Sequence, residues 1–136
     1  MRIKLDPGAF APVRVHKTDA GMDIKAMYGA TIGPGDSAVF HSGVHVELPP
    51  NTCGLIVSKS GLNVNGNITS TGLIDEGYDG EIVIKLYNHG KKVIQITRGQ
   101  RISQLVVLPV LYESIEIVDE INAGERGSSG FGSTGV

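Results

Sequence analysis

Residues 81–88 have the sequence EIVIKLYN, in which apolar side chains recur at every second position. Ile82, Ile84 and Leu86 form the apolar set. They alternate with Glu81, Val83, Lys85 and Tyr87. Successive side chains of a β-strand point to opposite faces of its sheet, so the three apolar residues would share one face. The stretch therefore predicts a β-strand with one buried face.

The same period continues outward from this stretch. In GVHVEL (43–48), Val44, Val46 and Leu48 would point one way. Further β-rich runs are CGLIVS (53–58), KKVIQI (91–96), SQLVVLPVLY (103–112) and ESIEIV (113–118). No window keeps a helical period for long, and 19 glycines and 6 prolines divide the chain into short segments. Many short strands separated by turn residues predict an all-β fold of the sandwich, jelly-roll or barrel type.

The totals indicate one domain with a tail. The chain has 136 residues, of which 40% are hydrophobic, enough for a core without disulfides or metals. From about residue 122 the composition becomes rich in glycine. We therefore expect a β domain over residues 1–121 and a flexible glycine-rich arm over residues 122–136.

Charge and hydropathy exclude several classes of partner. The net charge of -2 offers no basic face for nucleic acid. No segment approaches the roughly 20 apolar residues that span a bilayer, so no membrane contact is expected. MRIKLDPGAF (1–10) is not a secretory signal, and the single cysteine, Cys53, is compatible with a reducing compartment. We expect a cytoplasmic protein, in the host-cell cytoplasm if the chain is viral.

The arm RGSSGFGSTGV (126–136) allows two interpretations. A glycine- and serine-rich terminus is ordinarily a flexible tail, and composition alone favours that explanation. Alternatively, Phe131 could stack on a flat ring while Arg126, Ser133 and Thr134 bind phosphates. The glycine spacing resembles that of a nucleoside-triphosphatase P-loop, but Ser133 stands where that loop needs lysine.

The stretch TGLIDEGYDG (71–80) forms an acidic loop before the strand quoted first. Asp75, Glu76 and Asp79 would be the solvated carboxylates of a β-turn in the structural interpretation. In the functional interpretation, Asp75 orients a water molecule and Tyr78 forms the wall of a pocket. The loop alone does not decide between these two.

Three more stretches each have a structural explanation when taken singly. They are AGMDIKA (20–26), SKSGL (58–62) and RGQRISQL (98–105), which could be a capped turn, a bend at Ser60–Gly61 and a charged hairpin loop. Followed in order along the chain, and together with GLIDEGYDG and RGSSGFGSTG, they resemble the five motifs of the homotrimeric dUTPase family. The resemblance extends from residue 20 to residue 135.

The resemblance implies a β jelly roll that assembles as a homotrimer. Members of that family hydrolyse dUTP to dUMP and pyrophosphate, which limits uracil in DNA and supplies dUMP. Mg²⁺ accompanies the triphosphate. Active sites are shared: one subunit gives the first, second and fourth motifs, a second gives the third, and another lends the arm.

The resemblance also assigns roles to individual residues. Asp75 would orient the water that attacks the α-phosphorus, and Tyr78 would pack beneath the deoxyribose. Asp23 would help to place Mg²⁺ through its water shell. The remaining substrate-binding residues would be Lys59, Ser60 and Gly61 for the phosphates, Thr69, Gly72, Leu73 and Ile74 for the uracil edge, Gln104 for phosphate or water, and Arg126, Phe131, Gly132, Ser133 and Thr134 in the arm.

The chain departs from the family pattern at a few positions. Lys59 stands where arginine is usual, which replaces a bidentate fork by a point charge. Gly77 and Asp79 stand where aspartate and a basic or neutral polar residue are common. Asp79 would weaken anion binding if it faced the site.

Three alternatives remain open. A dCTP deaminase has the same fold and similar motifs, but its family carries a glutamate base in the strand where this chain has Lys85. A non-catalytic nucleotide-sensing or protein-binding module could also use this fold. A metal site at His41 and His45, four apart on one strand and so on one face, is the third, although Cys53, His16 and His89 complete no recognisable ligand set.

Overall fold

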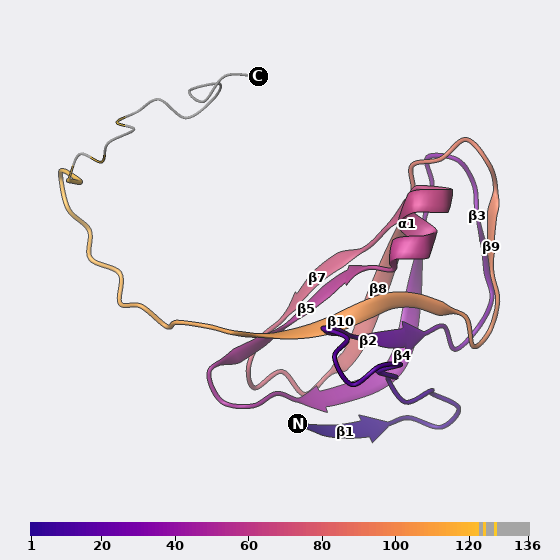
Figure 1. Cartoon of the computed structure of the whole chain (residues 1–136), viewed down its shortest axis with the longest axis horizontal. Helices are drawn as coiled ribbons and strands as arrows, with labels where there is room; N and C mark the ends of the chain where they lie inside the picture. Colours follow the sequence, from indigo (N-terminus) through magenta and orange to yellow (C-terminus); the bar gives the residue numbers. More distant parts are fainter. Residues whose placement is uncertain (123, 125–126, 128–136) are drawn as a thin grey trace.

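The computed structural model describes residues 1–122, 124 and 127, and most of its regular structure is β-strand (Figure 1). The strands are β1 (Arg2–Leu5), β2 (Gly21–Lys25), β3 (Ala30–Ile32), β4 (Ser37–Glu47), β5 (Thr52–Ser58), β6 (Ile68–Thr69), β7 (Thr71–Ile74), β8 (Glu81–Asn88), β9 (Ile94–Ile96) and β10 (Arg101–Pro109). A helix, α1 (Ser60–Gly66), follows β5. The predicted all-β class is confirmed.

Two four-stranded antiparallel sheets make up the body. Their strand orders are β1-β4-β8-β6 and β2-β10-β5-β7, and β3 pairs with β9 in a separate ribbon. Neighbouring strands come from distant parts of the chain, as in a jelly roll. This topology brings β2, β5 and β10, and with them the stretches around residues 23, 59 and 104, into one sheet.

The core lies between the two sheets. Phe40 and Ile84 from the first sheet and Ile24, Ile56 and Leu105 from the second are at most 2% exposed and belong to one apolar cluster. In β8 every second residue is buried, and the apolar residues of 43–48 are buried in the same way. The alternation that predicted these two strands is therefore confirmed.

Helix α1 corrects the expectation of a simple bend at Ser60–Gly61. It contains seven residues, none of them buried, so no apolar period marks it in the sequence. Its end is set by Asn67, which has a φ of 52° and donates its backbone N–H to the carbonyl of Asn63. Asparagine is one of the few residues that adopt this left-handed conformation readily.

The run ESIEIV (113–118) also differs from expectation, because it forms no strand. β10 ends at Pro109, and the chain then leaves the body of the molecule (Figure 1). Ile115 and Ile117 are 94% and 95% exposed. The sequence favours a strand there, but within this chain the segment meets no partner strand among the described residues.

Within the part of the chain that the structure describes, there is no helix long and apolar enough to cross a membrane. The domain boundary near residue 121 and the cytoplasmic location stay predictions.

Candidate active site

Asp23 is the centre of a polar cluster in the second sheet. Its side chain is only 4% exposed and lies on β2, directly opposite Gln104 of β10. Oδ1 of Asp23 accepts a hydrogen bond from Nε2 of Gln104 at 3.0 Å and lies 3.2 Å from Nζ of Lys59. Oδ2 accepts a hydrogen bond from Nη1 of Arg101 at 3.3 Å. A buried carboxylate thus holds two cations and an amide in fixed positions.

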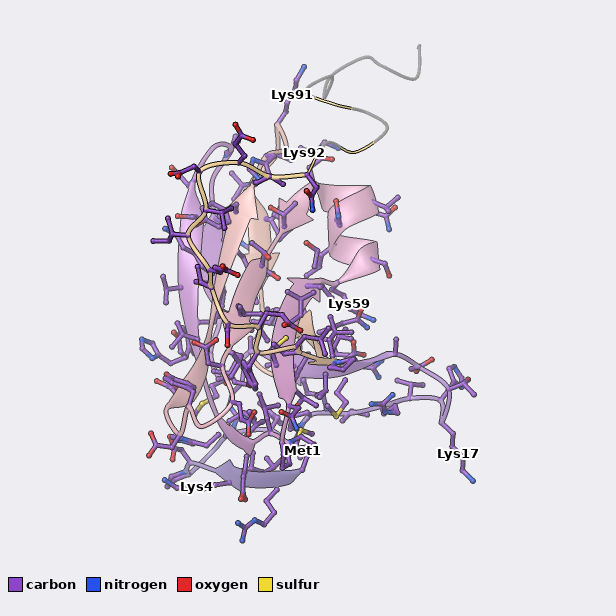
Figure 2. The ribbon with its side chains drawn as sticks, turned by 90° about the vertical axis from the view of Figure 1, so that its left-hand side faces the viewer. Met1, Lys4, Lys17, Lys59, Lys91 and Lys92 are labelled. Carbon is purple, nitrogen blue, oxygen red and sulfur yellow. The ribbon has the colours of Figure 1, made fainter. Side chains whose placement is uncertain are left out.

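These side chains line a cavity of about 410 Å³. Its other wall is the loop before β2, which includes His16 and Asp19. Oδ2 of Asp19 accepts the backbone N–H of His16 at 2.8 Å, which shapes this loop. Lys59 lies below the helix, on the side of the molecule from which the loop with Lys17 projects (Figure 2). With Lys59 and Arg101 beside it, the cavity can accept an anionic group.

Arg101 is a site residue that sequence reasoning missed. The sequence predicts a charged hairpin loop over residues 98–101, but Arg101 is the first residue of β10. Arg101 and Gln104 belong to the same RGQRISQL stretch, but the stretch alone does not indicate that Arg101 contacts Asp23. Only the pairing of β10 with β2 shows that both reach Asp23.

A second cavity, of about 300 Å³, lies beside the acidic loop. It is lined by Leu73, Ile74, Asp75, Tyr78, Glu81 and Val83. The hydroxyl of Tyr78 donates to the carbonyl oxygen of Glu81 at 3.1 Å, which fixes the ring over Gly80. Among the described residues no side-chain hydrogen bond engages the carboxylate of Asp75. Asp75 and Tyr78 are therefore brought together, and the carboxylate is available to a ligand.

The neighbouring carboxylate, Glu76, is already occupied. Its Oε2 accepts the backbone N–H of Asn51 at 2.9 Å and the hydroxyl of Tyr112 at 2.7 Å. The hydrogen bond to the Glu76 carboxylate raises the pKa of Tyr112 above its ordinary value. Glu76 therefore ties the acidic loop to the turn before β5 and to the segment after β10.

Within one chain, Asp75 and Lys59 lie at opposite ends of the β5–β7 ladder. Ile74, which precedes Asp75, pairs with Gly54, whereas Lys59 follows the last residue of β5. At about 3.3 Å per residue, Gly54 and Lys59 are separated by about 17 Å along the strand. Among the described residues, none lines both cavities. The structure of a single chain thus does not bring Asp75 to the Asp23 cluster.

The other predicted substrate-binding residues fall into three groups. Ser60 and Gly61 begin α1, next to Lys59. Thr69 ends β6, where its Oγ1 lies 3.0 Å from Nε2 of His89, and Gly72, Leu73 and Ile74 belong to β7. Those in the arm lie outside the described residues: Arg126, Phe131, Gly132, Ser133 and Thr134.

His41 and His45 are engaged by carboxylates and a carbonyl. A bulge between them shifts the register of β4 against β8, but the alternation is kept, and both histidines lie on the face opposite the buried Phe40 and Val44. His41 Nδ1 lies 2.5 Å from Glu81 Oε1, and His45 contacts the Asp79 carbonyl at 2.8 Å and Asp6 Oδ2 at 3.1 Å. The described residues contain no group of three or more His, Cys, Asp and Glu that could hold a metal ion.

The sequence matches the dUTPase family model over residues 9–135. The chain is 44% identical to the deoxyuridine 5'-triphosphate nucleotidohydrolase of Gloeothece citriformis, and the match covers 98% of this chain and 94% of the relative. The enzyme of that name from Clostridium acetobutylicum is 41% identical over the same shares.

Solved structures agree with the sequence matches. The dUTPase of Staphylococcus bacteriophage 80alpha with dUPNHPP superposes with a TM-score of 0.93 at 32% identity, covering 99% of this chain and 98% of that one. A mutant dUTPase from phage phi11 of S. aureus, which coordinates a structural Mg(II) ion, gives a TM-score of 0.82 at 27% identity over 90% and 98% of the two chains. Matched over nearly its whole length in sequence and in fold, the chain belongs to the dUTPase family.

Proposed function

We propose that this chain is a dUTP diphosphatase, which hydrolyses dUTP to dUMP and pyrophosphate and so limits uracil in DNA. The observation that carries the proposal is the buried Asp23, which holds Lys59, Arg101 and Gln104 around one cavity. Two cations fixed in this way form a binding site for a polyphosphate. Family membership and the nucleotide complex of the phage 80alpha relative support the choice of substrate.

The phosphate chain of the substrate would lie in the Asp23 cavity. Lys59 and Arg101 would bind phosphate oxygens, and Ser60 and Gly61 would add contacts beside Lys59. Gln104 would donate its amide to a phosphate or a water. Because Lys59 is a point charge, it supplies attraction with less directional control than a guanidinium would.

The base and sugar would lie against β7 and the acidic loop. Tyr78 would support the deoxyribose, and backbone groups from Thr69 to Ile74 would bind the uracil edge. Asp75 would hold a water so that its oxygen attacks the α-phosphorus. The bond from that phosphorus to the oxygen bridging toward the β-phosphate then breaks, pyrophosphate leaves, and the proton of the water passes to Asp75. Positioning of the water supplies most of the rate gain in such a step.

Mg²⁺ fits this site as an ion that the triphosphate carries. Both carboxylate oxygens of Asp23 already have protein partners, so the residue suits contact through a water rather than direct ligation. No protein cluster of three ligands exists among the residues described. When bound, the ion would neutralise phosphate charge and so favour departure of pyrophosphate.

We propose a homotrimer with shared sites. The separation of Asp75 from Lys59 within one chain supports it, because a complete site then needs two chains. The exposed Ile115, Ile117 and Ile121 support it as well, since at 94%, 95% and 91% exposure they form an apolar surface that the described part of the chain leaves uncovered. A second copy whose sheet accepts residues 113–118 as a strand would provide one.

The arm would complete the site. Phe131 would stack on uracil, and Arg126, Gly132, Ser133 and Thr134 would close on the phosphates. Because stacking and phosphate binding both need the nucleotide, this closure would depend on substrate.

The test compares dUTP, dCTP, dTTP and UTP in one pyrophosphate-release assay with Mg²⁺. The proposal predicts turnover of dUTP only. Ammonia released from dCTP would instead identify a deaminase, and binding without turnover would identify a nucleotide-sensing module. Lys85 argues against the deaminase, because a lysine stands at the position on β8 where the deaminase family carries its glutamate base.

A further inference from the structure

Three serines form a cluster where β5, β7 and β10 meet. Ser58 is the last residue of β5, Ser70 lies between β6 and β7, and Ser103 lies in β10. Ser103 is 0% exposed and Ser70 is 5% exposed. The hydroxyl oxygens of Ser70 and Ser103 are 2.6 Å apart.

The direction of the hydrogen bonds can be assigned. Ser103 donates its hydroxyl to the carbonyl of Val57 at 2.7 Å, so its single proton is used there. Ser70 must therefore donate to Ser103. Ser58 Oγ accepts the backbone N–H of Ser70 at 3.0 Å and donates to the Ser70 carbonyl at 3.2 Å. In the described part of the chain, no buried side-chain nitrogen or oxygen lacks a partner.

The cluster replaces backbone pairing at the end of a ladder. The β5–β7 register pairs Val57 with Thr71, so Ser58 and Ser70 would be the next pair. There the side chain of Ser58 makes both contacts with the backbone of Ser70. The strands are thus held together at the point where β5 turns into the segment that carries Lys59.

Each serine is also next in sequence to a proposed substrate-binding residue, either in the cavity around Asp23 or in the stretch from Thr69 to Ile74. Ser58 precedes Lys59, Ser103 precedes Gln104, and Ser70 follows Thr69. Ser103 pairs with Ser58 on one side and with Ile24, next to Asp23, on the other. A rotation of Ser103 or a loss of its bond to Val57 would change where Lys59 leaves β5 relative to Asp23.

We infer that Ser58, Ser70 and Ser103 are positioning residues that fix Lys59 and Gln104 for the triphosphate. The inference rests on the proposed function, because it takes these two residues as phosphate ligands. A β-ladder alone leaves the first residue beyond its end free to move. The cluster removes that freedom without placing a side chain in the cavity.

The test compares Ser103→Ala with Ser42→Ala. Ser42 is a matched control: it is 1% exposed, donates to the Ile82 carbonyl at 2.6 Å and accepts the N–H of Val44 at 3.1 Å, but it lies on β4 in the other sheet. Both variants should lose similar thermal stability. Only Ser103→Ala should weaken binding of a non-hydrolysable dUTP analogue with Mg²⁺, by about three- to tenfold, the effect of one hydrogen bond. Binding of dUMP should change by less than about twofold. The KM for dUTP should rise by a larger factor than kcat falls, because the variant loses binding of the substrate in its ground state.

The inference is overturned if the two variants weaken triphosphate binding equally, or if Ser103→Ala weakens dUMP and the analogue alike. If Ser103→Ala does not fold, Ser58→Ala gives the same comparison, because Ser58 is only half-buried. Failure of the wild-type chain to release pyrophosphate from dUTP would reject the proposed function. The binding comparison would still test the serines, since it needs no turnover.

Discussion

The ammonium nitrogen of Lys59 lies 3.2 Å from Oδ1 of Asp23, although Asp23 is on β2 and Lys59 lies between β5 and α1. Arg101 approaches Oδ2 of the same carboxylate. Asp23 therefore sets the position of both cations before a substrate arrives. Its negative charge also attracts both cations and so offsets their mutual repulsion.

Asp23→Asn should lower kcat/KM for dUTP by about 10- to 100-fold, because a hydrogen bond to a charged group contributes about 1.5–3 kcal/mol. The amide keeps the shape of the side chain but loses the charge that holds Lys59 and Arg101. Steady-state kinetics with dUTP measures the effect. Glu47→Gln is the control, since Glu47 pairs with Arg2 at the surface and such pairs contribute little. Wild-type kcat/KM in Asp23→Asn would contradict the role of Asp23.

The separation of Asp75 from Lys59 leads to a prediction about mixed assemblies. Asp75→Asn alone should nearly abolish turnover while nucleotide binding stays measurable, and Lys59→Ala should greatly weaken activity. Refolding equal amounts of the two inactive chains together should restore activity. About a quarter of the sites in a random trimer would combine a wild-type Lys59 from one chain with a wild-type Asp75 from its neighbour.

Pyrophosphate release by the mixture, compared with each variant refolded alone, measures this restoration. Size-exclusion chromatography of the mixture checks that the chains have assembled. If the mixture stays as inactive as its components although assembled, each site takes both residues from the same chain.

Those parts of the fold that a single chain completes were predictable from the sequence. The alternation of Ile82, Ile84 and Leu86 gave the right strand and the right buried face because a core in the same chain receives these residues. Residues 113–118 have an equally clear β-pattern but form no strand here, because a strand also needs a partner. A local sequence pattern indicates that a segment prefers the β conformation, but it does not indicate whether a partner strand lies beside it.

The resemblance named three of the four residues in the cluster around Asp23. The resemblance selected Asp23, Lys59 and Gln104, and the structure brings these three together. Arg101 was missed because its role depends on the pairing of β10 with β2, which no local pattern specifies. The helix at residues 60–66 was missed for a related reason, since a helix without a buried face leaves no periodic signal.

Gly80→Ala should impair the pocket of Tyr78. A methyl group at this position would overlap the phenol oxygen of Tyr78 and approach its Cε2 to 2.9 Å. The ring would have to move and give up its hydrogen bond to the Glu81 carbonyl. We expect the KM for dUTP to rise by about three- to tenfold, the effect of about one lost hydrogen bond, because the displaced ring would no longer support the sugar.

Gly35→Ala is a useful comparison for Gly80→Ala, because a Cβ added at Gly35 meets no heavy atom of the described residues within 4 Å. Its φ of 78° means that this control loses stability through backbone strain alone. A variant at Gly80 that binds dUTP as well as the wild type would show that Tyr78 does not support the sugar.

His45 should make the stability of the acidic loop depend on pH. Both of its partners, the Asp79 carbonyl and the Asp6 carboxylate, are acceptors, so both ring nitrogens can donate only when the imidazole is protonated. The hydrogen bond to the Asp79 carbonyl, followed by the one to Asp6, raises the pKa of His45 above 6.5, although Lys4 acts in the opposite sense. A raised pKa in the folded state means that the stabilisation is complete below pH 6.5 and is lost as the pH rises through the raised value.

Thermal unfolding of the wild type and of His45→Gln should therefore differ most at low pH, with the difference shrinking above pH 6.5. Asp6→Asn keeps the imidazole but removes the negative charge of one acceptor. In this variant the stabilisation by protonated His45 should therefore begin to be lost at a lower pH than in the wild type. A wild-type advantage that stays constant, or that grows toward alkaline pH, would show that the protonated imidazole does not anchor Asp79.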